Sequence, residues 1–265
     1  MRRILLTNDD GFAAPGLRAF ADALTCLPDV EVTVVAPSLE QSAKSHAITL
    51  HTPMRIHEHA PRWFHVDGTP SDCAFIGINH ILRDAPPDLV CSGINHGPNV
   101  GSDVLYSGTV AAAMEAALIG TRGVAFSLVR GKDFETAARR GARIVRALLD
   151  RPLSPGVVLN VNLPETAGST GDAIAITRLG RRSYGSAVVE RLDPRGKPYV
   201  WIGGFEANYE RAGGTDCEAV FIEGKTSITP LTLDCTANDA LPLLNDWIDS
   251  SELSDSSDLS EARGA

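Results

Sequence analysis

The sequence predicts an α/β fold in which a doubly wound, mostly parallel sheet is followed by an extension rich in β-hairpins. Over residues 1–165, short β-branched or apolar runs alternate with segments whose apolar residues recur at helical spacing. This alternation is typical of parallel βαβ units. After Pro164 the pattern changes to glycine-rich, strand-like pieces. We therefore expect a core at 1–165, an extension with a C-terminal helix at 166–249, and an acidic, disordered tail at 250–265.

The individual elements follow from hydrophobic spacing and turn residues. Arg3–Thr7 is apolar and ends at an Asn-Asp-Asp-Gly turn, which predicts a strand. Pro15–Leu27 has apolar residues at helical spacing and a proline in its first turn. By the same reasoning, helices are expected at Cys73–Leu82, Thr109–Ile119, Phe134–Leu149 and about Asp239–Ile248, and strands at Val30–Ala36, Ile48–His57, Trp63–Val66, Asp88–Cys91, Gly123–Ser127, Val157–Asn162, Ala173–Leu179, Tyr199–Gly203 and Ala219–Thr229.

Composition excludes some classes of partner. The chain has 265 residues, with 33 Asp and Glu against 24 Lys and Arg, and a formal net charge of -9. This excess of negative charge argues against electrostatic binding to nucleic acid or to an anionic membrane surface. The apolar runs have strand length, far short of the roughly 20 residues that span a bilayer. A small phosphate-bearing substrate is not excluded, because such an anion responds to the local charges of its site.

Cysteine usage indicates the compartment. The five cysteines are scattered and show no Cys-x-x-Cys spacing. This is typical of buried thiols in a reducing environment and argues against a disulfide framework or a cysteine zinc site. Two aspartates cut short the apolar run of the N-terminus, so it does not read as a signal peptide. We expect a cytoplasmic protein.

The strongest local signal is the pair Asp9 and Asp10, directly after the first predicted strand. In open α/β sheets, ligands bind beyond the carboxyl ends of the strands. Adjacent carboxylates repel each other unless a positive group lies between them, and a hard divalent cation such as Mg²⁺ or Mn²⁺ prefers oxygen ligands. Because Asn-Asp-Asp-Gly is also good turn chemistry, the tetrapeptide alone leaves a turn and a metal site equally open.

A glycine-rich segment follows the strand predicted at Asp88–Cys91 and reaches the same edge of the sheet. Its three glycines allow a close approach of the backbone, and Asn95 and Asn99 offer amide contacts. A tight connection has a similar composition, and the spacing does not match a dinucleotide-binding fingerprint. Alone, this segment is a weak signal.

Small hydroxyl residues mark the start of the alanine-rich helix at Thr109–Ile119. Ser107 or Thr109 is first of all a helix N-cap, but the free N–H groups of a helix start also attract anions, most often phosphate. On the same edge, the polar loop after the second strand supplies Ser42 as an oxygen ligand and Lys44 or His46 as phosphate contacts. A cation site beside an anion site suggests metal-assisted phosphoryl chemistry on a small phosphate ester.

These motifs resemble the survival protein E (SurE) family of metal-dependent nucleoside 5′-monophosphate phosphatases. The resemblance covers roughly residues 1–248 and leaves the acidic tail outside it. The matching blocks are Asn8–Gly11, Val35–Pro37, Gln41–Ala43, Asp67–Pro70, Ser92–Asn99, Tyr106–Val110, Gly214–Asp216 and Gly224–Leu231.

The resemblance implies a Rossmann-like core, one divalent metal ion (Mg²⁺ or Mn²⁺) per subunit, and a hairpin arm that makes a homodimer or homotetramer. Nucleoside 5′-monophosphates are the implied substrates, with 3′-monophosphates and polyphosphate ends as further ones. In the loop Pro37–Gln41, Ser38 and Gln41 replace a common aspartate and a common arginine, and the lost positive charge bears on substrate preference. The implied metal ligands are Asp9, Asp10, Ser42 and Asn95, with Asp9 and Asp10 also catalytic, and the implied phosphate-binding residues are Asn99, Ser107, Gly108 and Thr109.

Two rival classes share part of this pattern. A phospho-accepting receiver domain, which regulates partners and has no turnover, also carries paired acids after its first strand. Such domains are about half this length and need a lysine after a late strand, whereas here Lys132 lies five residues beyond the strand predicted at Gly123–Ser127. A sugar-nucleotide transferase is disfavoured because the metal-loop blocks match the phosphatases.

Overall fold

The structure, a computed structural model, forms two compact units, Met1–Leu233 and Asp234–Ala265. The first unit contains the sheet and every predicted site residue; the second contains a short 3₁₀ turn and α6 (Leu241–Ser250). No helix among the described residues is both long and apolar enough to cross a membrane. The described residues are 1–165, 173–184, 188–203 and 208–250, so nearly all of the predicted acidic tail lies outside them.

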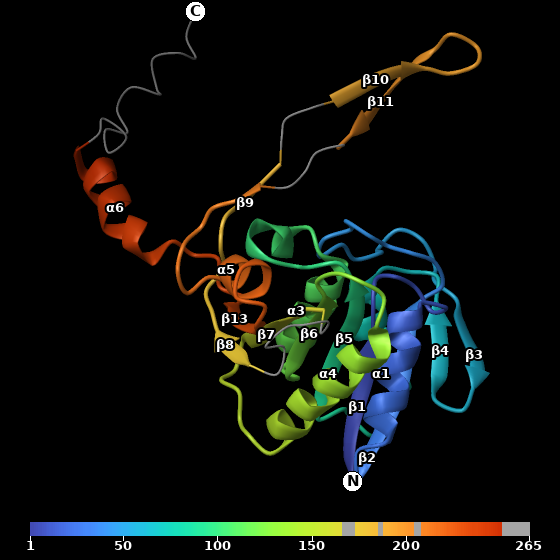
Figure 1. Cartoon of the computed structure of the whole chain (residues 1–265). Coiled ribbons are helices and arrows are strands. Elements are labelled where there is room, and N and C mark those ends of the chain that lie inside the picture. The colour runs from blue at the N-terminus through green and yellow to red at the C-terminus, as the bar shows by residue number, and fades with distance from the viewer. Residues whose placement is uncertain (166–172, 185–187, 204–207, 251–265) are drawn as a thin grey trace, which may run out of the picture. The chain divides into compact units, whose positions relative to one another are not determined.

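Nine strands of the first unit form one sheet, in the order β3-β4-β2-β1-β5-β6-β7-β13-β8 (Figure 1). The neighbours from β4 through β7 run parallel, whereas β3 and β13 are antiparallel to β4 and β7. The predicted doubly wound, mostly parallel sheet is therefore confirmed. The strands are β1 (Arg2–Thr7), β2 (Val30–Pro37), β3 (Ile56–Ala60), β4 (Trp63–Val66), β5 (Leu89–His96), β6 (Gly123–Leu128), β7 (Val157–Leu163), β8 (Ile174–Ile176) and β13 (Thr226–Thr232).

Helices cover both faces of the sheet (Figure 1). On one face α1 (Pro15–Thr25) packs beside α4 (Phe134–Leu149), and on the other α2 (Pro70–Ile76) packs beside α3 (Gly108–Leu118). The strand β1 shows why both are needed. Its Ile4 and Leu6 belong to the hydrophobic cluster under α1 and α4, while Leu5 between them belongs to the cluster with α2 residues. A strand buried on both faces reads as a continuous apolar run, which is how the sequence predicted it.

Two predicted elements were wrong in part. Ile48–His57 was expected to be a strand, but only β3 from Ile56 onward is one. Ala219–Thr229 was also expected to be a strand, yet it begins within a helix, α5 (Asp216–Phe221). The reason is the cap: the hydroxyl of Thr215 accepts a hydrogen bond from the Glu218 N–H at 3.2 Å and starts a helix that the β-branched residues alone do not suggest.

Four further short strands lie in the extension. The strands β10 (Val188–Leu192) and β11 (Pro198–Ile202) pair antiparallel as a hairpin. The strand β9 (Arg182–Ser183) pairs with β12 (Asn208–Tyr209). β8 and β13, from the same part of the chain, complete the main sheet.

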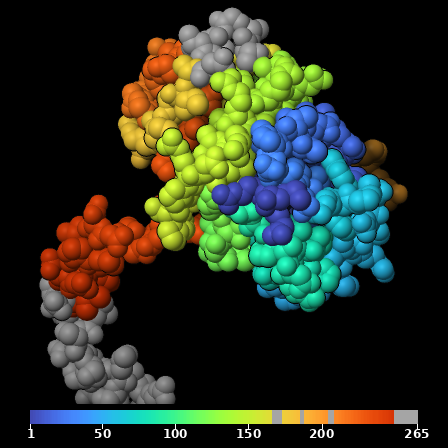
Figure 2. Space-filling model, turned by 90° about the horizontal axis from the view of Figure 1, so that it is seen from below, coloured from blue at the N-terminus to red at the C-terminus, as the bar shows by residue number. Residues whose placement is uncertain are grey.

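The predicted site residues and the N-terminus of the chain lie at opposite ends of the sheet. The predicted site residues follow the carboxyl ends of the strands, as the topology requires. Figure 2 looks onto the opposite end, where the N-terminus of the chain, in dark blue, is exposed.

Candidate active site

A cavity of about 400 Å³ opens at the carboxyl ends of β1 and β5. Six of the eight predicted site residues line it, and the other two, Gly108 and Thr109, contact Asp9 from the start of α3. Segments far apart in the sequence thus meet at one place. The lining residues are Asp9, Asp10, Glu40, Ser42, Ala43, Asn95, His96, Pro98, Asn99, Asp103, Tyr106, Ser107, Arg182 and Tyr184.

Asp9 is a buried carboxylate, with 4% of its surface exposed. The hydroxyl of Thr109 donates a hydrogen bond to its Oδ1. Burial, with the neighbouring charge of Asp10, raises the pKa of Asp9 to about 6 despite that hydrogen bond. α3 approaches this closely because residue 108 is glycine: a Cβ there would lie 2.9 Å from the Asp9 Cβ.

Asp10 is less buried and is held from the other side. The backbone N–H of His96, at the end of β5, donates a hydrogen bond of 3.0 Å to its Oδ2. Burial nevertheless raises the pKa of Asp10 above its ordinary value, and the charge of Glu40 adds to the effect. The cavity therefore concentrates negative charge.

The loop that carries Ser42 is fixed at both ends. The N–H of Gln41 donates to the carbonyl of Asp9 at 2.7 Å, and the N–H of Ser45 donates to the carbonyl of Tyr106 at 3.0 Å. Beyond it, a ring nitrogen of His46 lies 2.7 Å from a carboxylate oxygen of the buried Glu115. His46 is thus engaged by α3 and is not among the residues that line the cavity.

The two asparagines of the glycine-rich segment have different surroundings. Asn95 donates its side-chain amide to the Gly97 carbonyl at 2.8 Å, which leaves its amide oxygen available as a ligand. Asn99 is buried, and its amide donates to the Ser127 hydroxyl at 2.9 Å. Its backbone N–H and carbonyl are both hydrogen-bonded by the side chain of Asn162, at 2.9 and 3.0 Å. Asn99 therefore fixes the cavity wall as well as lining it.

Ser107 is the N-cap of α3, since its hydroxyl accepts a hydrogen bond from the Val110 N–H at 3.1 Å. The prediction that this residue is a helix N-cap is therefore confirmed. This role is compatible with the predicted phosphate contact, because Ser107 also lines the cavity.

Three residues of the cavity wall were not predicted from the sequence. Two come from the extension and one, Asp103, from a 3₁₀ turn at Gly101–Leu105. Arg182, on β9, forms an ion pair with Asp103, and the hydroxyl of Tyr184 donates to Asp103 at 2.7 Å. Burial, followed by the Asp103 hydrogen bond, raises the pKa of Tyr184 to about 12. Arg182 is the one arginine or lysine among the described residues that line the cavity.

A family model described as "Survival protein SurE" matches residues 4–186. The chain belongs to the SurE family. A protein named "5'-nucleotidase SurE" from Myxococcus xanthus is 52% identical over 248 residues, which cover 93% of each chain. One of the same name from Vibrio campbellii is 44% identical over 246 residues, 93% of this chain and 94% of that one. The crystal structure of the SurE protein from Aquifex aeolicus has a TM-score of 0.81 at 38% identity, and it covers 92% of this chain and 99% of that one.

The donor set of this SurE-family cavity fits a divalent cation. Two carboxylates, an amide oxygen and a hydroxyl are hard oxygen donors. Asp9 is buried without a cationic side chain hydrogen-bonded to it among the described residues. One residue earlier, Oδ1 of Asn8 is also buried and lacks a hydrogen-bond partner within the described part of the chain. A cation in the cavity would compensate the Asp9 carboxylate.

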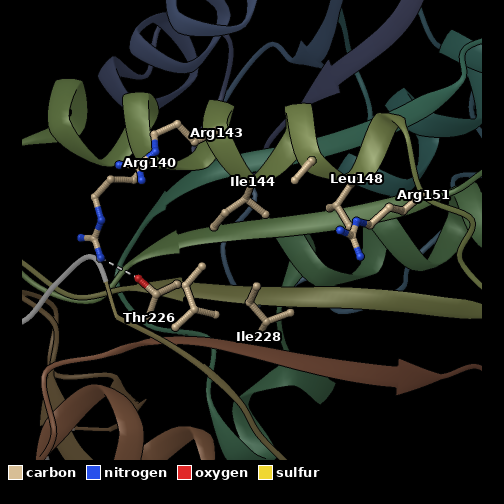
Figure 3. Close-up of a pocket in the computed structure, with 9 residues that line it drawn as sticks. Arg140, Arg143, Ile144, Leu148, Arg151, Thr226 and Ile228 are labelled. Atoms are coloured by element: carbon tan, nitrogen blue, oxygen red, sulfur yellow. Dashed lines mark hydrogen bonds between the residues drawn. The ribbon is translucent and has the colours of Figure 1, made fainter.

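A second cavity, of about 280 Å³, lies between α4 and β13 and has a different lining (Figure 3). Ile144, Leu148 and Ile228 give it an apolar wall, and Arg140 donates a hydrogen bond of 2.6 Å to the Thr226 hydroxyl. No carboxylate is among the described residues that line it. Of these two cavities, the one at Asp9 is therefore the candidate location for the metal-dependent chemistry expected of a SurE-family protein.

Proposed function

We propose that this protein is a divalent-metal-dependent phosphatase, a phosphoric monoester hydrolase that converts nucleoside 5′-monophosphates to nucleoside and phosphate. The relatives named 5'-nucleotidase SurE, at 44–52% identity over more than nine tenths of the chain, support this activity. One observation carries the proposal: the paired carboxylates of Asp9 and Asp10 and the N-terminus of α3 meet in a single cavity.

Asp9, Asp10, Ser42 and Asn95 would hold one Mg²⁺ or Mn²⁺ per subunit. When bound, this cation supplies a Lewis acid that lowers the pKa of water and neutralises charge on the phosphoryl oxygens.

The protein's own groups position the substrate. The N–H groups at the start of α3, with Ser107, Thr109 and Asn99, bind the phosphate, and Arg182 adds a positive charge to the wall. Asp9 or Asp10 orients the attacking water and accepts its proton. Phosphoryl transfer depends mainly on such positioning and electrostatic stabilisation, so no phosphoenzyme is required.

The extension serves assembly in this proposal. Most of the large apolar side chains of the β10–β11 hairpin are exposed, and among the described residues this hairpin pairs with no third strand. Apolar surface of this kind favours an interface with another subunit. We propose a homodimer or homotetramer formed through this arm, so that residues 166–249 both complete the sheet of the core at 1–165 and supply the assembly arm. The five free thiols suit a cytoplasmic location.

The test is a phosphate-release assay on purified protein with a panel of nucleoside 5′- and 3′-monophosphates and polyphosphate. With Mg²⁺ or Mn²⁺ we expect release from 5′-monophosphates, abolition by EDTA, and recovery when either metal is restored. Activity that is indifferent to the chelator contradicts the metal mechanism. Absence of release from every 5′-monophosphate contradicts the substrate class.

A further inference from the structure

Three histidines gather on the hairpin formed by β3 and β4, which lies at one edge of the sheet (Figure 1). His57 and His65 are direct cross-strand partners in the antiparallel register, so both side chains lie on the same face. His59 follows His57 by two residues, and Asp67 comes directly after β4. None of the four lines the cavity that holds Asp9.

Each of the four side chains contacts at least one of the others. The rings of His57 and His65 stack with centroids 4.6 Å apart. Nε2 of His59 lies 2.7 Å from Nδ1 of His65, a ring-to-ring hydrogen bond. Nε2 of His57 is 3.9 Å from a carboxylate oxygen of Asp67. One ligand atom from each of His57, His65 and Asp67 lies within 4.8 Å of the other two.

This arrangement is poorly suited to protonated histidines. Three imidazolium groups at these separations repel one another, and one carboxylate cannot compensate them. Burial, followed by the charges of His57 and His59, lowers the pKa of His65 from its ordinary value. Neutral imidazole is the state in which histidine binds metal, so the surroundings of His65 favour its role as a ligand.

We propose that His57, His65 and Asp67 form a second cation site, specific for a borderline transition metal and occupied by Zn²⁺. Two imidazole nitrogens and one carboxylate oxygen are zinc ligands, whereas Mg²⁺ prefers an all-oxygen set such as the one at Asp9. His59 completes the site: with the proton on Nδ1 of His65, that nitrogen donates to Nε2 of His59, and Nε2 of His65 is left for the ion. The remaining coordination position is open to water.

The ion joins β3, an edge strand of the sheet, to β4. Among the described residues β3 pairs with one strand only, β4, and all five of its residues are exposed. A metal ion bound by residues of both strands would stabilise the pairing of β3 with β4. It would also fix the ring of His59, which stacks on Phe12 at 4.5 Å, two residues beyond Asp10.

The test is zinc titration by calorimetry of EDTA-treated, dialysed full-length protein in excess Mg²⁺, with Co²⁺ as a spectroscopic probe of the ligand set. We expect one zinc equivalent per chain. Affinity should fall about tenfold or more in H57Q and D67N, both at exposed positions, and in H65Q. The matched control H80Q, an exposed histidine on another segment, should bind zinc as the wild type does.

Two further measurements make the result decisive. The D9N/D10N variant should keep the zinc site, which separates it from the proposed catalytic metal. Zinc should raise the melting temperature of the wild type and of H80Q but not of H57Q. The proposal is overturned if the wild type binds no zinc in Mg²⁺, or if H57Q and D67N bind it as tightly as the wild type.

Discussion

Two aspartates at opposite ends of the same strands, β1 and β5, have opposite surroundings. Asp88, at the amino end, accepts hydrogen bonds from the Arg3 N–H at 2.8 Å and from the Arg2 guanidinium at 3.2 Å. Burial would raise the pKa of Asp88, but these hydrogen bonds and the charges of Arg2 and Arg122 outweigh it and lower the pKa. Asp9, at the carboxyl end, has no such cation and its pKa is raised to about 6.

The difference separates a structural carboxylate from a functional one. At the amino end the chain supplies the positive charge, so Asp88 ties the start of β1 to β5. At the carboxyl end the described part of the chain gives the two carboxylates hydrogen bonds but no arginine or lysine partner, which costs folding free energy unless a ligand supplies the positive charge. Substitutions at the two ends should therefore affect different properties.

The largest effect is expected for Asp9→Asn. If Asp9 holds the metal and faces the attacking water, kcat should fall by about 10³-fold or more, roughly 4 kcal/mol of barrier. The melting temperature in EDTA should not fall, because asparagine can still accept the Thr109 hydrogen bond and no ion pair is lost. Steady-state phosphate release and calorimetry check the two parts. Wild-type turnover, with Mn²⁺ present, would reject the site.

A smaller loss of activity is expected for Gly108→Ala. The added Cβ would lie 2.9 Å from the Asp9 Cβ and 3.0 Å from Pro70, so the start of α3 and the carboxylate must move apart. We expect kcat to fall about 10- to 100-fold, because a displacement of less than 1 Å at a reacting centre is costly. The matched control is Gly213→Ala, where no atom lies within 4 Å of the new Cβ and the backbone is not in the left-handed region, so activity should stay at the wild-type level.

Ser107→Ala should act mainly on binding. The hydroxyl caps α3 and faces the cavity, so its loss should raise KM for a nucleoside 5′-monophosphate about tenfold and lower stability by about 1 kcal/mol. Ser107→Gly separates the two effects, because glycine is tolerated as an N-cap at a cost of only a few tenths of a kcal/mol. An unchanged KM in both variants contradicts the phosphate-binding role.

The sequence predicted the elements whose signal is local. The doubly buried run of β1, the helical spacing of α1 and α4, and the turn at Asp9 and Asp10 each lie within a dozen or so residues. Because parallel strands present their carboxyl ends at one edge, the topology then placed Ser42, Asn95 and Ser107 near the aspartates.

What the sequence missed depends on contacts between distant segments. Arg182 reaches the cavity through Asp103, 79 positions away, and no spacing rule links the two. Asn162 reads as an ordinary strand residue, although its side chain fixes Asn99 from 63 positions away. The start of α5 was missed because one capping threonine outweighed a β-rich run.

The smallest effect is expected for Asp88→Asn, which tests the amino end of the comparison. Asparagine keeps an acceptor for the Arg3 N–H but loses the charge, so stability should fall by about 1 kcal/mol, screened by partial exposure, with kcat and KM unchanged. Because the pKa of Asp88 is lowered in the folded state, its contribution is complete above the unfolded value of 3.8 and is lost as pH falls through the folded value. Denaturant unfolding should therefore show a wild-type advantage at pH 7 that shrinks below pH 3.8. A constant difference across that range, or reduced phosphatase activity at pH 7, would contradict a purely structural role for Asp88.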